Sequence, residues 1–110
     1  MDGMPDRFSE ITVLYARWLA APFPARMRGR DVAGVDMVSL DADVAGCVRV
    51  WLDNGGVLDD RRWACLGRRL DELDRTVPLL TGDPESAYYI ACRTVAALVW
   101  ETEPTDRASV

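Results

Sequence analysis

The feature that most constrains the fold of this chain is the spacing of its apolar residues, which recur every three or four positions along four separate segments. The clearest case lies in residues 59–77, where five residues keep that rhythm without a break: Trp63, Leu66, Leu70, Leu73 and Val77. An α-helix turns once in about 3.6 residues, so residues spaced in this way share one face and need a neighbour to cover it. We therefore predict an all-α fold, a compact bundle of four main helices forming a single domain over residues 1–110.

The first helix is predicted over residues 5–21 and is followed by a loop over residues 25–35. Apolar residues at helical spacing define the helix, Pro5 suits its first turn, and Pro22-Phe23-Pro24 ends it. The next eleven residues show no sustained period, so we expect a connecting loop with room for one short turn of helix. A connection of this length in a compact domain is often functional or mobile, which makes the loop one of two places where a function could lie.

The second helix, residues 36–54, ends clearly at Asn54-Gly55-Gly56 but has two possible starts. If Asp36 is the N-cap, the helix presents a long apolar face and Asp41 points into it. If Asp41 is itself the cap, the helix is shorter and backbone N–H groups bind its carboxylate. We favour the longer helix, which makes Asp41 a structural buried carboxylate. Such a group needs a partner. The loop supplies three candidates: Arg26, Arg28 and Arg30.

The third and fourth helices are predicted over residues 59–77 and 84–101. Pro78 should end or bend the third helix. Asp83-Pro84-Glu85 opens the fourth with an N-cap, a first-turn proline and an acid beside the positive end of the helix dipole. The interior of the fourth helix carries one charged residue, Arg93, and is apolar almost all the way round. This helix should therefore lie at the centre of the bundle or at an interface.

Three smaller features complete the expected architecture. No segment shows the alternation and tight turn typical of a β-hairpin, so we expect no sheet. Residues 104–110 are expected to form a frayed tail. Gly46 lies mid-helix, one turn after Ala42, and such a small-residue patch usually lets another helix approach closely.

The residue types that are absent exclude several chemistries. Without histidine, the chain cannot form a Ser-His-Asp or Cys-His triad or a mixed Cys/His zinc site, and without lysine it cannot form a Schiff base. We therefore expect no enzymatic activity, no cofactor and no metal. Aspartates remain the one catalytic alternative, because their oxygens suit magnesium, although helix capping or solvation explains each of them. They are Asp36, Asp41, Asp43, Asp53, Asp59 and Asp60.

Net charge and cysteine content set expectations about partners and location. A net charge of −5 would repel nucleic acid and would speed encounter with a basic protein. Three cysteines without a CxxC pair, Cys47, Cys65 and Cys92, read as core residues in a reducing compartment. The N-terminal residues do not resemble a signal peptide, and no apolar stretch reaches the length of about eighteen residues expected of a membrane helix. We therefore predict a cytoplasmic protein without a membrane partner, and the bias towards Arg, Ala, Val and Leu is typical of a GC-rich bacterial genome.

Two groups of residues are candidates for binding. The three loop arginines, Arg26, Arg28 and Arg30, could together hold a phosphate or an acidic protein edge, or could simply be solvated. The second group is aromatic, because large aromatic side chains serve both as core filler and as interface anchors. Within it we predict that Tyr89 and Trp100, on a different part of the fourth helix from Tyr88, contact a partner.

The hypothesis that best joins these features is a non-catalytic, protein-binding module. Small acidic helical proteins with paired tyrosines include the bacterial immunity proteins that block nucleases. The chain is similar to them in size, charge and the pair Tyr88-Tyr89, a similarity that assigns no family but implies an inhibitor or accessory role. One alternative is a homo-oligomeric structural or regulatory protein in which the fourth helix pairs with its copy. The other is a metal-dependent enzyme that uses the aspartates.

Overall fold

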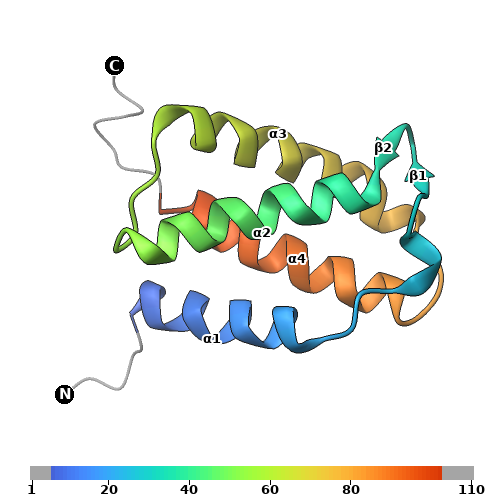
Figure 1. Ribbon diagram of the computed structural model, residues 1–110, viewed down its shortest axis with the longest axis horizontal. Helices are drawn as coiled ribbons and strands as arrows, with labels where there is room; N and C mark the ends of the chain where they lie inside the picture. The colour runs from blue at the N-terminus through green and yellow to red at the C-terminus, as the bar shows by residue number, and fades with distance from the viewer. Residues whose placement is uncertain (1–5, 103–110) are drawn as a thin grey trace.

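The computed structural model describes residues 6–102 as four helices packed side by side, and it confirms the all-α bundle (Figure 1). The predicted role of Pro5 and the expected frayed tail of residues 104–110 lie outside the described residues. The four helices, with bounds close to those predicted, are α1 (Arg7–Ala20), α2 (Met37–Asp53), α3 (Asp60–Thr76) and α4 (Glu85–Trp100).

Helix α4 is the central helix of the bundle, as its apolar circumference predicts. It packs against each of the other three helices, whereas α1 lies mainly on α4 and α3 lies across α2 and α4 (Figure 1). The side chains that face this junction are fully or almost fully buried, among them Tyr89, Cys92, Val95, Ala96 and Val99. Because α4 lies beside each of the other helices, residues of α4 line more than one surface hollow.

The start of α2 decides between the two possibilities left open by the sequence. Asp36 is the N-cap, and its carboxylate accepts hydrogen bonds from the backbone N–H groups of Val38 and Ser39 at 3.0 and 3.2 Å. The longer helix is therefore confirmed, and Asp41 lies inside it. At α4 the expected capping by Asp83 is wrong, because Pro84 occupies the cap position and no side chain caps the helix.

Residues 25–35 contain the short turn of helix that the sequence allowed for, together with a small sheet that it did not predict. The short helix η1 (Ala25–Met27) is followed by the strands β1 (Asp31–Val32) and β2 (Val35–Asp36), which pair antiparallel. The two residues between the strands, Ala33 and Gly34, have φ values of 51° and 79°. A turn with two positive φ values matches the twist of a hairpin, which explains how strands of two residues can pair here.

All three tyrosines of the chain donate their hydroxyl hydrogens to α2. Tyr89 binds the carbonyl oxygen of Met37 at 2.9 Å, Tyr88 binds the Asp41 carboxylate at 2.7 Å, and Tyr15 binds the carbonyl oxygen of Ala45 at 3.1 Å. The three acceptors are four residues apart, so they form one row along α2. Helix α2 is therefore tied to α4 by two hydrogen bonds and to α1 by a third.

The glycine that permits close helix packing is Gly67 on α3, and the prediction made for Gly46 is wrong. A Cβ added at Gly46 would meet no atom within 4 Å, so no helix approaches that position closely. A Cβ at Gly67 would lie 2.7 Å from the ring of Trp100. Helices α3 and α4 can therefore approach each other at this point only because residue 67 has no side chain.

A further short helix, η2 (Val77–Leu79), follows α3 directly and contains Pro78. The proline ends the α-helix as predicted, but the chain continues through one tighter turn before it leaves for α4. Helix α4 then begins close to η1. This part of the bundle is therefore where the loop segment, η2 and the start of α4 meet (Figure 1).

Candidate functional site

The aromatic residues predicted as partner contacts are placed differently from that expectation. Tyr89 is fully buried, so its prediction as an exposed partner contact is wrong: its ring lies in the core and its hydroxyl is used by Met37. Burial raises the pKa of the Tyr89 phenol, in keeping with this position. Trp100 is partly buried and packs edge-on against Trp63 with the ring centroids 5.7 Å apart. Its ring also lies beside Gly67 across the interface between α3 and α4.

The tyrosine of α4 that comes nearest to solvent is Tyr88, which is 8% exposed. Its hydroxyl donates to the half-buried carboxylate of Asp41, and this bond corrects the prediction that an arginine from residues 26–30 would partner that carboxylate. Burial raises the pKa of Asp41, although the bond from Tyr88 lowers it. Burial and the adjacent carboxylate both raise the pKa of Tyr88. In this bond the phenol is the hydrogen donor and the carboxyl group the acceptor.

The three arginines predicted as an anion site contact different parts of the protein. Arg26 lies 3.4 Å from the carboxylate of Glu85, whose side chain is almost fully buried at the start of α4. The guanidinium of Arg28 lies over the ring of Phe23, 5.6 Å from its centroid. The backbone of Arg30 bonds to residues 27 and 37 within the segment that leads into α2. Arg26 and Arg28 therefore contact different residues, and these contacts do not bring their guanidinium groups together at one anion position.

A mixed apolar and polar hollow of about 340 Å³ lies between the end of α1 and the start of α2, and we call it the α1–α2 surface. Two large apolar side chains beside it are strongly exposed, Leu19 at 51% and Val38 at 41%. Arg28 and Asp41 supply opposite charges, and the ring of Tyr88 reaches the hollow from α4. It is lined by Leu19, Ala21, Phe23, Arg28, Val38, Asp41, Ala42 and Tyr88.

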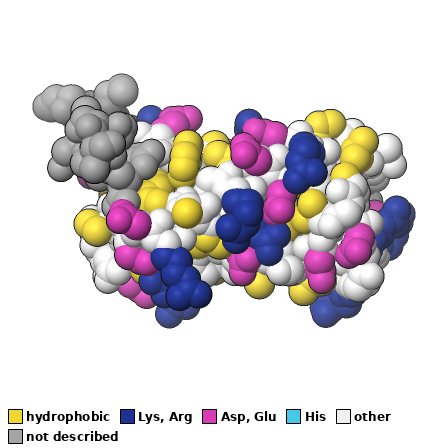
Figure 2. All heavy atoms as spheres, turned by 90° about the horizontal axis from the view of Figure 1, so that it is seen from above, with side chains coloured by type: hydrophobic (Ala, Val, Ile, Leu, Met, Phe, Trp, Pro, Cys, Tyr) yellow, Lys and Arg dark blue, Asp and Glu magenta, His cyan; other side chains and the backbone are white. Residues whose placement is uncertain are grey.

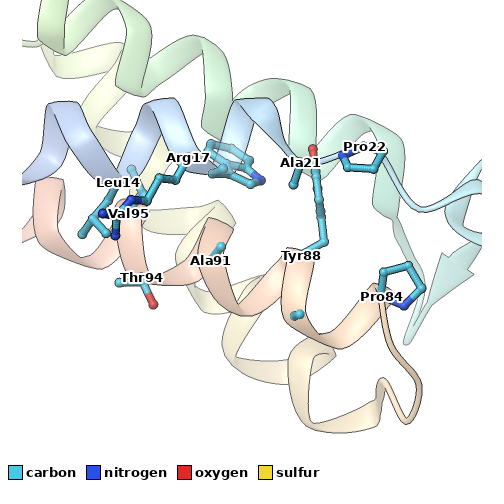
Figure 3. A pocket seen from close by; sticks show the side chains of 11 residues that line it. Leu14, Arg17, Ala21, Pro22, Pro84, Tyr88, Ala91, Thr94 and Val95 are labelled. Carbon is cyan, nitrogen blue, oxygen red and sulfur yellow. The ribbon is translucent and has the colours of Figure 1, made fainter.

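A second hollow, of about 380 Å³, runs between α1 and α4, and we call it the α1–α4 groove (Figure 3). Its walls are apolar apart from Arg17, Thr94 and the hydroxyl of Tyr88. On α4 the facing positions are held by Ala87 and Ala91, whose side chains are too short to fill the space beside α1. The lining residues are Leu14, Arg17, Trp18, Ala21, Pro22, Pro84, Ala87, Tyr88, Ala91, Thr94 and Val95.

The two hollows share the residues Ala21 and Tyr88. Tyr88 is held between Trp18, Phe23 and Tyr89, with centroid distances of 6.1, 5.4 and 5.2 Å, respectively. Edge-to-face aromatic packing of this kind fixes the position of a ring. Both hollows are therefore built on one rigid side chain.

A third hollow, between α2 and α3, contains two of the three cysteines. Cys47 and Cys65 line it, and all three cysteines of the chain are free thiols. Burial, with a contribution from Cys65, raises the pKa of Cys47 to about 12, so this thiol stays protonated at neutral pH. Burial also raises the pKa of Cys92 well above its usual value. Because the thiolate is the reactive form, neither Cys47 nor Cys92 is suited to act as a nucleophile.

The aspartates considered for a metal site have structural partners. Asp43 pairs with Arg69, Asp53 with Arg49 and Asp59 with Arg62, and Asp36 caps α2. Within residues 6–102, no group of three or more Cys, Asp or Glu side chains is placed to hold a metal ion. None of the helices in this range is both long enough and apolar enough to cross a membrane. On the face seen in Figure 2, arginine and acidic side chains are interspersed, and no single sign of charge dominates.

Comparisons with known proteins supply no relative for this arrangement. No family model matches the chain, no curated protein matches it, and no solved structure matches its fold. Most residues of the two hollows could not be predicted from the sequence. The signal that indicates the groove is the pair Ala87 and Ala91, four residues apart on a helix with large neighbours.

Proposed function

We propose that this chain is a non-catalytic, cytoplasmic protein-binding module that contacts its partner through the α1–α2 surface. The observation that carries the proposal is the exposure of Leu19 and Val38, 51% and 41%, beside a hollow that also contains charged and aromatic groups. Exposed apolar side chains are common singly, but a group of them around a hollow with polar groups is typical of a protein interface.

The residue types at this surface are those that dominate binding energy in protein interfaces. Tyr88, Phe23 and Arg28 are of the aromatic and arginine types enriched at interface centres. Arg28 is held against the ring of Phe23, and Tyr88 is held by Asp41, so both side chains are ordered before a partner arrives. Groups that are already ordered lose less conformational entropy on binding, which favours affinity.

The partner that best complements the chain is a protein with a basic surface. The net charge of −5 speeds encounter with such a partner and makes the rate depend on salt. An inhibitor or accessory role fits a small acidic domain of this kind. Tyr88 takes the place of Tyr89 as the tyrosine of α4 that takes part, since Tyr89 is enclosed in the core.

The proposal can be tested with two variants that carry the same charge change. Leu19→Arg places a positive charge on the α1–α2 surface, and Val57→Arg places one in the turn between α2 and α3, where Val57 is 62% exposed. Each immobilised variant, and the unmodified chain, is exposed to a lysate of the source cells. Retained proteins are identified by mass spectrometry, and the strongest is then purified and titrated calorimetrically.

We expect one basic protein to be retained by the unmodified chain and by Val57→Arg but not by Leu19→Arg. In the titration, Leu19→Arg should weaken binding at least tenfold, which corresponds to about 1.4 kcal/mol. An unchanged set of retained proteins on Leu19→Arg, or no retained protein at all, would contradict the proposal. Light scattering on the pure chain tests the oligomer alternative, because a dimer that Leu19→Arg dissociates would show that the surface binds a second copy.

A further inference from the structure

The α1–α4 groove has the composition of a small-molecule site and lies apart from most of the proposed protein-contact surface. Ligand sites are typically hollows of about 300–1,000 Å³ with apolar walls and a few polar groups. The groove, at about 380 Å³, falls in this range and has one charged side chain, Arg17, and two side chains with a hydroxyl, Thr94 and Tyr88. The Thr94 hydroxyl donates to the carbonyl oxygen of Ile90 and the Tyr88 hydroxyl donates to Asp41, so Arg17 is the principal donor that remains for a ligand.

Arg17 has no acidic partner within the described part of the chain. The arginines at positions 7, 26, 49, 62, 69 and 93 each form an ion pair, but no carboxylate of residues 6–102 pairs with Arg17. Its side chain extends from α1 towards α4, at the end of the groove marked by Thr94 and Val95 (Figure 3). An unpaired guanidinium beside apolar walls is suited to bind a carboxylate, because its parallel N–H groups match the two oxygens.

The rest of the groove is suited to an apolar body. Ala87 and Ala91 leave space along α4, and the span from Ala87 to Val95 is about 12 Å at the helical rise of 1.5 Å per residue. The floor includes Trp18 and Tyr88, which are almost fully buried, so the hollow reaches the edge of the core. The indole N–H of Trp18 is buried without a hydrogen-bond acceptor, although it lies near the Tyr88 hydroxyl.

We propose that the α1–α4 groove binds a small apolar molecule that carries one carboxylate, with its apolar body along Trp18, Ala87 and Ala91 and its carboxylate on Arg17. Medium-chain fatty acids and aryl-substituted alkanoic acids belong to this class. The groove shares Ala21 and Tyr88 with the proposed protein contact, but the two proposals are tested separately, since the partner titration can fail while ligand binding succeeds, and the reverse also holds.

The test is titration of the full chain with decanoate, followed by calorimetry and by tryptophan fluorescence, to which Trp18 in the groove wall contributes together with the three other tryptophans. Decanol supplies the same apolar body without a charge, and decyltrimethylammonium supplies it with the opposite charge. Three variants accompany the unmodified chain. Arg17→Gln removes the guanidinium, Ala91→Leu fills the groove from a partly exposed helix position, and Arg75→Gln is the matched control on α3.

We expect decanoate to bind one site and Arg17→Gln to weaken it about tenfold, the effect of losing one charge-assisted interaction. Decanol should bind the unmodified chain more weakly than decanoate does, and it should bind the unmodified chain and Arg17→Gln equally. Decyltrimethylammonium should bind most weakly of the three. Ala91→Leu should abolish binding of decanoate, and Arg75→Gln should leave it unchanged. If Ala91→Leu fails to fold by circular dichroism, Ala87→Leu at an exposed position of the same helix serves in its place.

Three results would overturn the proposal. One is the absence of heat and fluorescence change with decanoate up to its solubility limit. Another is equal decanoate affinity in the unmodified chain and in Arg17→Gln, because the carboxylate would then have no partner at that residue. The third is decanoate binding that survives both groove-filling variants, because the molecule would then bind elsewhere.

Discussion

The contribution of the Tyr88–Asp41 hydrogen bond to stability can be measured with variants that remove its donor or the charge of its acceptor. Tyr88→Phe keeps the ring in its aromatic cluster and removes only the hydroxyl, which leaves a half-buried carboxylate without its donor. A hydrogen bond to a charged group contributes about 1.5–3 kcal/mol. Because Asp41 is only partly buried, the expected loss is about 1 kcal/mol at pH 7, or a melting temperature lower by about 4 °C.

The burial of Asp41 predicts a pH dependence whose sign follows from the raised pKa of this carboxyl. Burial raises this pKa above the ordinary value of 3.8, so the folded protein holds the proton more tightly than the unfolded chain does. The stability contributed by protonated Asp41 is fully present below that value and is lost as the pH rises through the folded pKa. Asp41→Asn is neutral at every pH, and its stability relative to the unmodified chain should therefore increase between pH 4 and pH 7.

The assay is urea unfolding, followed by circular dichroism at both pH values, of the chain, the two single variants and the double variant. Asparagine can still accept the Tyr88 hydrogen through its amide oxygen, but without a charge. Tyr88→Phe should thus cost about half as much in the Asp41→Asn background as in the unmodified chain. The reasoning would be refuted if Tyr88→Phe cost the same in both backgrounds, or if Asp41→Asn lost relative stability as the pH rose.

Four further substitutions test backbone and packing features, each by urea unfolding. Gly46→Ala should stabilise the chain by up to about 1 kcal/mol, because the added Cβ meets open space. Gly67→Ala should destabilise it by about 1–3 kcal/mol, because the added Cβ meets the ring of Trp100. A stability change of the same sign in both variants would contradict the described packing. Ala33→Asn should stabilise the hairpin by about 0.5–1 kcal/mol, since asparagine tolerates the φ of 51° better than alanine, and a loss of stability would argue against this turn. Thr76→Val should be neutral or stabilising by about 1 kcal/mol, because the buried Thr76 hydroxyl has no hydrogen-bond partner, and a clear loss would indicate a partner for it.

Helix positions could be predicted from the sequence because each helix has an apolar rhythm and a breaker at its end. The longer form of α2 also followed, since Asp36 precedes the first apolar residue of the face and its carboxylate meets free backbone N–H groups. The central place of α4 followed from its lack of a polar side. Each of these features depends on residues that are close together in the sequence, so it can be predicted from the sequence alone.

The burial of Tyr89 could not be predicted for the same reason that α4 is central. A helix that is apolar all round has no periodic signal that tells which of two adjacent tyrosines faces the core, and only packing with the other helices decides it. The partner of Asp41 was equally hidden. Opposite charge suggested an arginine, whereas the actual donor lies 47 positions away on another helix.

The small sheet and the groove could not be predicted because neither leaves a pattern in the sequence: the strands are too short, and the groove is an unfilled volume. Strands of two residues cannot show alternation, although the Ala33-Gly34 turn could have been read as a hairpin signal. The groove is the space left by Ala87 and Ala91 beside α1. A missing volume becomes visible only after the facing helix has been placed.

The row of acceptors on α2, the carbonyl oxygens of Met37 and Ala45 with the carboxylate of Asp41 between them, bears on how this bundle selects one arrangement. Apolar packing tolerates a small rotation of a helix about its own axis, because contact between hydrocarbons has little directional preference. A phenol hydrogen requires its acceptor within a narrow range of distance and angle. Three such requirements along one edge fix the rotation of α2 about its own axis, so replacing every tyrosine by phenylalanine should yield a bundle that still collapses but no longer settles into a single packing.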